Sequence, residues 1–119
     1  MTALEIKNWY NNYDTSQGLD SLLKYRQHLS LCMYEMSLTI AELEGKSKAK
    51  EAERRIQQAI KELDSDEGTA AARKQDAVKQ TREILEDEAR YEGQLKGYRI
   101  QYDALNGISH SMASYINKG

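Results

Sequence analysis

The sequence predicts an all-α chain, built as a long, coiled-coil-like antiparallel helical hairpin with a short N-terminal helix packed at its base. Apolar residues recur at alternating steps of four and three along two long segments, the spacing of helices that supercoil around each other. The 119 residues include no proline, so no position forbids a long uninterrupted helix. Charged residues make up 30% of the chain, a share typical of long exposed helices. We therefore expect a single helical domain, residues 1–119.

The short helix is expected at about residues 3–11. Thr2 can accept a hydrogen bond from the backbone N–H of Glu5, and Glu5 can reach back, which is the capping-box pattern. The run of residues 11–16, which begins at the last residue of this helix, is rich in Asn, Asp, Ser and Thr. Their side chains compete for backbone hydrogen bonds and should end the helix.

The second helix is expected from about residue 16 to residue 63. Its first heptad stripe contains one polar residue, Arg26, among apolar ones: Leu22, Leu29, Met33, Met36, Ile40 and Leu43. The next heptad positions, Ser47 and Lys50, are polar. The apolar pattern resumes two residues out of phase, at Gly45, Ala49, Ala52, Ile56, Ala59 and Leu63. Such a phase jump predicts a bend or break near Gly45, a weak helix former.

Residues 64–68 are expected to form an acidic turn in which Gly68 is free to take a positive φ. Thr69 can cap the third helix, expected at about residues 69–117. Its stripe runs without a skipped step through Ala77, Thr81, Ile84, Glu88, Tyr91, Leu95, Tyr98, Tyr102, Leu105, Ser109, Met112 and Ile116. A five-residue turn cannot connect long parallel helices, so the two must be antiparallel.

Residues 21–41 and 104–119 carry few charges, and residues 29–40 are apolar on more than one face. A helix of that kind is normally buried by more than one neighbour. We expect a homo-oligomer held at this end, the alternative being a monomer whose base is closed by three helices. The expected interface residues are Trp9, Leu31, Leu38, Ile108 and Tyr115.

Nine cations flank the turn and could follow a phosphate backbone with salt-sensitive affinity. These candidate nucleic-acid-binding residues are Lys46, Lys48, Lys50, Arg54, Arg55, Arg73, Lys74, Lys79 and Arg82. Arg54 and Arg55 are both expected to lie off the packing stripe. Interleaved acidic residues leave open the alternative of an ordinary solvated helix face. Tyr91, Tyr98 and Tyr102 could stack on bases, or they could simply fill the stripe between the helices.

The sequence carries no motif of an enzyme, a metal site or a cofactor site, so we expect none of these and no small-molecule substrate. The two histidines, His28 and His110, belong to no HExxH, CxxC or Glu-x-x-His pattern. No apolar run is long enough to span a membrane, and the start of the chain lacks the order of a signal peptide. A single cysteine, Cys32, suits the reducing cytoplasm.

The segment LKGYRIQYDALNGISHSMASYI, residues 95–116, follows an Asn- and Tyr-rich helical start and a helix–acidic turn–helix core. In these features and in size, most of the chain resembles the small helical accessory proteins of tailed bacteriophages, in particular the UvsY-type recombination mediators. The resemblance implies a ring-forming protein of the host cytoplasm. Such a protein binds single-stranded DNA and helps to load a recombinase onto strands covered by single-strand-binding protein.

The function expected from the sequence is therefore that of a non-enzymatic, oligomeric accessory protein associated with single-stranded nucleic acid. Two alternatives remain open. One is a phage-type protein-binding module or inhibitor that acts on a host or defence protein through its helical surface. The other is a structural coiled-coil component.

Overall fold

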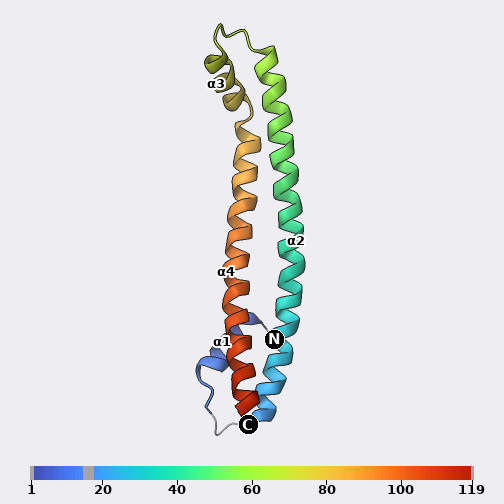
Figure 1. Ribbon diagram of the computed structural model, residues 1–119, viewed down its shortest axis with the longest axis vertical. Helices are drawn as coiled ribbons and strands as arrows, with labels where there is room; N and C mark the ends of the chain where they lie inside the picture. Colours follow the sequence, from blue (N-terminus) through green and yellow to red (C-terminus); the bar gives the residue numbers. More distant parts are fainter. Residues whose placement is uncertain (1, 15–17, 119) are drawn as a thin grey trace. The chain divides into compact units, whose positions relative to one another are not determined.

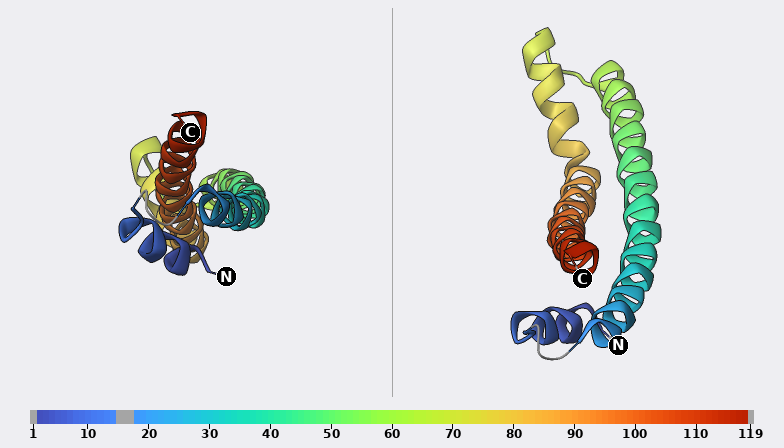
Figure 2. Two further views of the ribbon diagram at one scale, coloured as in Figure 1. Left: turned by 90° about the horizontal axis from the view of Figure 1, so that it is seen from below. Right: turned by 60° about the horizontal axis from the view of Figure 1, so that its bottom comes forward.

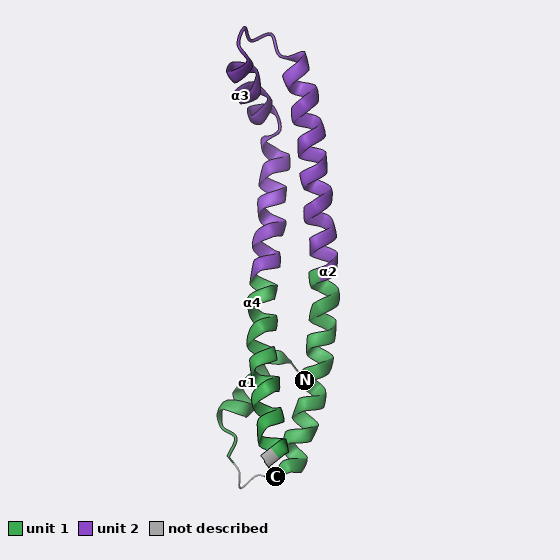
Figure 3. Ribbon diagram, in the orientation of Figure 1, with its two compact units in different colours: residues 1–40, 97–119 green, residues 41–96 purple. Residues whose placement is uncertain are grey.

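The computed structural model describes residues 2–14 and 18–118 of the chain, and these residues form an all-α helical hairpin without strands. The elements follow in the order α1 (Ala3–Asn11), α2 (Leu19–Asp64), α3 (Ala70–Gln80) and α4 (Arg82–Lys118) (Figure 1). The chain divides into two compact units (Figure 3). Unit 1 comprises Met1–Ile40 and Gly97–Gly119, and unit 2 comprises Ala41–Lys96.

Unit 1 packs α1 against the first part of α2 and the last part of α4 (Figure 2). The α1 helix has the expected bounds, and its cap is Thr2, whose hydroxyl oxygen accepts from the N–H of Glu5 at 3.2 Å. The five most enclosed apolar side chains of this unit form one cluster: Ile6, Leu22, Leu29, Leu105 and Met112. The α2 helix begins at Leu19, and the expected start at residue 16 lies outside the described residues.

The two predicted heptad stripes face the interior in both units. Every position of the first stripe, from Leu22 to Leu43, is buried or half-buried, including Arg26. The same holds for the second stripe from Ala77 to Ile116, except for Tyr98, which is 37% exposed. The 4-3 spacing thus predicted the inward-facing residues of α2 up to Leu43 and those of α3 and α4.

Of the bend or break expected near Gly45, the break is wrong, because α2 continues through this residue to Asp64. Beyond Leu43 the original heptad keeps facing inward although its members are polar. These half-buried residues, the inner stripe, are Ser47, Lys50, Arg54, Gln57 and Lys61. The displaced apolar residues, the outer stripe, are all exposed: Gly45, Ala49, Ala52, Ile56, Ala59 and Leu63. Two of the inner side chains, Lys50 and Arg54, find acidic partners on α4, so the helix has no need to change phase.

The connection between α2 and α3 is held by side-chain hydrogen bonds. Ser65 donates to Asp76 at 2.9 Å and accepts from the N–H of Glu67 at 3.3 Å. Thr69 caps α3 by accepting from the N–H of Ala72 at 3.1 Å. The predicted positive φ at Gly68 is wrong, since the one described glycine with a positive φ is Gly18, at 81°. Side chains that bond the local backbone make a left-handed residue unnecessary here.

The third helix is interrupted at Thr81, contrary to the continuous helix expected over residues 69–117. Thr81 ends α3 with φ −106° and ψ 19°, and its N–H bonds both Ala77 O at 3.1 Å and Val78 O at 3.3 Å. Its hydroxyl donates to Ala77 O at 2.8 Å. A threonine that bonds the preceding turn competes with the regular helical pattern and often bends a helix. Thr81 fits the heptad, so periodicity alone could not predict the interruption.

Candidate nucleic-acid interface

The nine predicted nucleic-acid-binding residues all lie in unit 2, on α2, α3 and the start of α4. The segments on either side of the connection between α2 and α3 are rich in charged residues and other strong helix formers. Both segments are therefore helical, and most of their surface is charged. Their environments differ enough to divide them into three groups. These are cations in exposed ion pairs, cations turned toward the interior, and cations without an ion pair.

Three of the nine form exposed ion pairs one helical turn apart. They are Lys46 with Glu42 at 3.1 Å, Arg55 with Glu51 at 2.6 Å, and Arg82 with Glu86 at 3.7 Å. Exposed pairs of this kind are weak, about 0.3–0.5 kcal/mol, and a phosphate could displace the carboxylate. Lys46 also lies over the ring of Tyr91, 6.0 Å from its centroid. These cations are available to an anion at a small cost.

Arg54 is directed into unit 2, contrary to the expectation that it lies off the packing stripe. Its Nε donates to Oε2 of Glu88 at 2.5 Å and its Nη2 to Oε1 at 3.4 Å, while Nη1 donates to Gln58 at 3.3 Å. Glu88 is 8% exposed. The hydrogen bond that Arg54 donates to Glu88 raises the pKa of Arg54, so the guanidinium stays charged throughout the accessible pH range. Arg54 is a structural residue of the inner stripe.

Lys50 is also turned inward. Its Nζ lies 3.1 Å from Glu53 and 3.7 Å from Asp87 of α4. The hydrogen bond and the charge of Glu53 raise the pKa of Lys50 above 10.5, and Asp87 adds to the effect, while burial opposes it. Lys50 thus helps to join α2 to α4, and it offers less to a ligand than the exposed cations do.

Four cations form no ion pair with any described residue. One is on α2 and three are on α3: Lys48, Arg73, Lys74 and Lys79. All four are exposed, and the three on α3 fall within roughly 9 Å of helix rise. Ala77 marks the buried side of α3, so these side chains project around the rest of its circumference. Of the nine cations, these are the least compensated.

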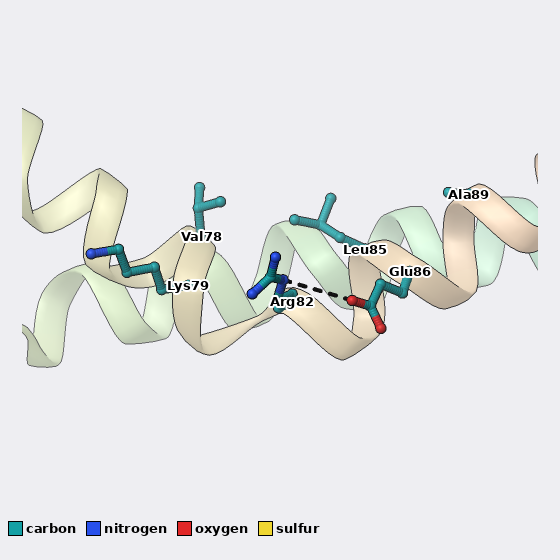
Figure 4. A pocket seen from close by; sticks show the side chains of 6 residues that line it. All are labelled: Val78, Lys79, Arg82, Leu85, Glu86 and Ala89. Atoms are coloured by element: carbon teal, nitrogen blue, oxygen red, sulfur yellow. Dashed lines mark ion pairs between the residues drawn. The ribbon is translucent and has the colours of Figure 1, made fainter.

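A hollow of about 740 Å³ lies beside the junction of α3 and α4. Figure 4 shows the Arg82–Glu86 pair at this hollow, and Lys79 extending from α3 away from that pair. Its apolar lining comes from Val78, Leu85 and Ala89. An apolar surface with cations at its edge can accept a ligand that combines a flat apolar part with negative charge, as a nucleotide does.

The tyrosines of the second stripe are engaged in packing. Tyr91 and Tyr102 are half-buried, and the ring of Tyr91 also lies 5.7 Å from the guanidinium carbon of Arg90. Tyr98, in unit 1, is the most exposed of the three at 37%. This arrangement favours the packing interpretation over a ladder of rings open to bases.

The five predicted oligomer-interface residues all lie in unit 1, and they differ in how far their own chain covers them. Trp9 stacks on Tyr25 with ring centroids 3.9 Å apart, and Ile108 packs against the buried cluster. Leu31 and Leu38 are 57% and 54% exposed, and Tyr115 is also exposed. The exposed Tyr34, between the two leucines in the sequence, was not predicted.

No family model, no curated protein and no solved structure matches the chain. No helix of residues 2–14 and 18–118 is both long and apolar enough to cross a membrane. Nor do three potential metal-ligating side chains converge anywhere in that part of the chain.

Sequence reasoning missed two features of unit 2. One is the role of Glu88 as the partner of Arg54, and the other is the exposure of the outer stripe. Both could have been found by extending the first heptad stripe beyond Leu43 without requiring apolar residues. Arg54 then falls on the inward face, and Glu88 is the acidic residue of the second stripe. A polar residue at a heptad position often specifies pairing.

Proposed function

We propose that this chain is a non-enzymatic, oligomeric accessory protein that binds single-stranded nucleic acid through unit 2. Recombination mediation, with a recombinase as protein partner in the cytoplasm, is the specific role that we propose within this class. The observation that carries the proposal is the set of exposed cations on α3, Arg73, Lys74 and Lys79, which form no ion pair with any described residue.

Two features of unit 2 support this proposal. Uncompensated cations attract phosphates without first having to break an ion pair. The hollow beside Val78 and Leu85 offers an apolar surface next to them. The net charge of the chain is −2, so the attraction has to be local, and summing several copies in an oligomer would strengthen it.

The experiment is a fluorescence-polarisation titration of a labelled single-stranded DNA at two or more salt concentrations. We expect saturable binding that weakens steeply as salt rises and depends little on base sequence. The triple variant Arg73→Ala/Lys74→Ala/Lys79→Ala should weaken binding. It should also reduce the slope of log affinity against log salt by about 2, at roughly 0.7 per lost phosphate contact.

The matched control is Lys7→Ala/Lys24→Ala/Lys96→Ala, which removes the same charge from three exposed lysines elsewhere. If both triple variants weaken binding equally, net charge is responsible and α3 is not the site. An absence of binding by the unmodified protein at low salt would reject the function itself. Circular dichroism checks that both variants keep their helix content, as alanine favours the helix.

A second candidate function, a protein-binding module, is favoured by the apolar patch on the unit 1 part of α2. Leu31, Tyr34 and Leu38 are all more than half exposed, and they are spaced so that they share one face of the helix. This patch is also where we propose that oligomers form. Light scattering on Leu31→Glu tests that proposal, because a charge placed in a buried interface should dissociate the assembly. A mass of 13.6 kDa for the unmodified chain would reject oligomer formation.

A further inference from the structure

The outer stripe of α2 leaves large apolar side chains in solvent within unit 2. Leu63 is 86% exposed, Ile56 is 60% exposed, and Ile60 beside them is 44% exposed. The stripe keeps strict 4-3 spacing from Gly45 to Leu63, the pattern of a helix face that packs on another helix. Within the described part of unit 2, α3 and α4 pack against the inner stripe, on the opposite side of α2. The start of α3 lies only at the edge of the outer stripe, where Ala70 and Leu63 line the same hollow.

We propose that the outer stripe binds the outer stripe of a second copy of this chain, with the two α2 helices antiparallel. In this alignment Leu63 faces Gly45 of the second copy, Ile56 faces its Ala52, and Ala49 faces its Ala59. Each layer therefore places a large side chain against a small one, or two small ones together, which allows close packing. A parallel alignment would instead set Leu63 against Leu63 and Gly45 against Gly45, producing a clash and a void.

The surface around Gly45 has room for the leucine that this alignment brings. Apart from Gly45 itself, its two neighbours and the nearby backbone of α2, no atom of the described chain lies within 4 Å of the position that a β-carbon of Gly45 would occupy. A helix that has a glycine or alanine at each contact point lets its partner approach closely, so the side chain of Leu63 can reach the backbone there. The predicted weak point of α2 thus becomes the receiving surface for a side chain of the second copy.

Charge complementarity selects the same alignment. Lys48 and Glu62 lie two heptads apart, so they flank the outer stripe on the same side. Neither forms an ion pair with any described residue. In the antiparallel alignment Lys48 meets Glu62 of the second copy, and the symmetry of the pair repeats the contact. A parallel alignment would instead bring Lys48 toward Glu53, whose carboxylate already has Lys50 as a partner.

Like charges do meet at the centre of the antiparallel pair, where Glu53 faces Glu53 and Arg55 faces Arg55 of the second copy. Each already has a counter-ion in its own chain. Glu53 lies 3.1 Å from the amine of Lys50, and Arg55 lies 2.6 Å from Glu51. These neutralised pairs weaken the repulsion that the bare charges would have.

This interface goes beyond the proposed function, because it depends neither on nucleic acid nor on the apolar patch of unit 1. It would affect nucleic-acid binding if both occur. Arg73 and Leu63 line the same hollow. Leu63 is the last residue of the outer stripe, and Lys48 of the second copy approaches this end of the stripe. Dimerisation would therefore place Arg73 of one copy beside the pair of Glu62 with Lys48 of the second copy, at each end of the interface.

The first test is the mass of the full chain by light scattering during size exclusion at high micromolar concentration, without nucleic acid. Ile56→Glu should shift the protein to a smaller species and raise the dissociation constant roughly tenfold or more, since it buries an unpaired charge. Gly45→Leu should do the same without adding charge, because the new side chain would collide with Leu63 of the second copy. The matched control Val78→Glu places a glutamate at an exposed apolar position of α3 and should leave the mass unchanged.

The second test is charge reversal. Lys48→Glu should weaken association, and the double variant Lys48→Glu/Glu62→Lys should restore it, because the pair is then re-formed with its signs exchanged. Restoration cannot come from a general change in net charge, since Glu62→Lys alone should weaken association as well. An unmodified protein that stays monomeric, a mass that Ile56→Glu leaves unchanged, or a double variant without rescue would each overturn the proposal.

The third test reads the orientation directly. In a Cys32→Ser background, a tagged Ala49→Cys chain is mixed with an untagged Ala59→Cys chain and oxidised. The antiparallel alignment predicts disulfides mainly between tagged and untagged chains, which gel mobility distinguishes. Products dominated by tagged–tagged and untagged–untagged dimers would show a parallel interface and reject the alignment.

Discussion

Arg54 of α2 and Glu88 of α4 form a two-point contact in the interior of unit 2. The Nε–Oε2 distance is 2.5 Å and the Nη2–Oε1 distance is 3.4 Å. Paired donors of a guanidinium match the two oxygens of a carboxylate, so the contact fixes orientation as well as distance. Because Glu88 is almost fully buried and sits on the second heptad stripe, the pair determines which face of α2 lies toward α4.

Removing one member of this pair should destabilise the protein, and removing both should largely restore stability. Arg54→Leu or Glu88→Leu leaves the remaining charge without its partner, whereas the double leucine variant replaces the pair by apolar contact. Thermal and urea unfolding of the four proteins form a double-mutant cycle. Arg55→Leu is the control, and its effect should stay within about 0.5 kcal/mol, as for other surface changes. Losses that simply add would contradict a direct interaction.

The amine of Lys50 should titrate above 10.5, because Glu53 and then Asp87 raise its pKa. A folded-state pKa above the unfolded one means that the protonated amine stabilises the fold below 10.5, and that this stabilisation is lost as pH rises through the folded value. NMR titration of the lysine side chain measures this. Glu53→Gln should lower the pKa of Lys50 more than Asp87→Asn does, and the reverse order would show that the cross-helix contact dominates.

Leu29→Ala should destabilise unit 1 by about 2–5 kcal/mol, since it leaves a cavity at a fully buried position. Leu23→Ala is the matched control on the same helix, at a position that is 44% exposed. Its effect should be several-fold smaller. Urea denaturation at a fixed protein concentration compares the two, and equal losses would mean that Leu23 is covered in solution.

Thr81→Ala should join α3 and α4 into one helix. The substitution removes the hydroxyl that bonds Ala77 O and introduces a better helix former, by up to about 0.7 kcal/mol. Amide hydrogen exchange over residues 79–83 should become slower in this variant and stay fast in Thr81→Ser, which keeps the hydroxyl. Unchanged exchange in the alanine variant would show that the interruption has another cause.

The hydrophobic pattern predicted the class of fold and the buried residues of unit 1, because there the heptad positions are apolar and burial decides which face turns inward. Leu22, Leu29, Leu105 and Met112 are the clearest cases. The same reasoning failed in unit 2 beyond Leu43. There the prediction placed the apolar residues of α2 on the inward face. In the structure the polar residues face inward instead, because Arg54 of α2 donates a hydrogen bond to Glu88 of α4.

The sequence predicted the candidate site as a group of nine cations, without showing which of them are paired. Spacing shows which residues share an arm, but it does not show which carboxylate each one finds. Lys46 and Arg55 have acidic neighbours one turn away that reading the sequence could identify, whereas the contact of Lys50 with Asp87 depends on the alignment of two helices. The uncompensated cations of α3 could therefore be singled out only from the fold.

Between Gly45 and Leu63, the inner and the outer stripe of α2 have the same 4-3 spacing and are displaced by two residues. A rotation of this part of α2 by about 200° about its own axis would therefore exchange the two faces. The exchange would require α2 to unwind near Gly45, because the stripe up to Leu43 would have to stay inward, whereas burial of apolar area alone would favour it. The contact between Arg54 and Glu88 opposes it. A ligand that drew Glu88 away from Arg54 would bias the helix toward the rotated arrangement and enclose the outer stripe. In that case the interior of unit 2 and the binding properties of its surface would be thermodynamically linked through the rotation of one part of α2.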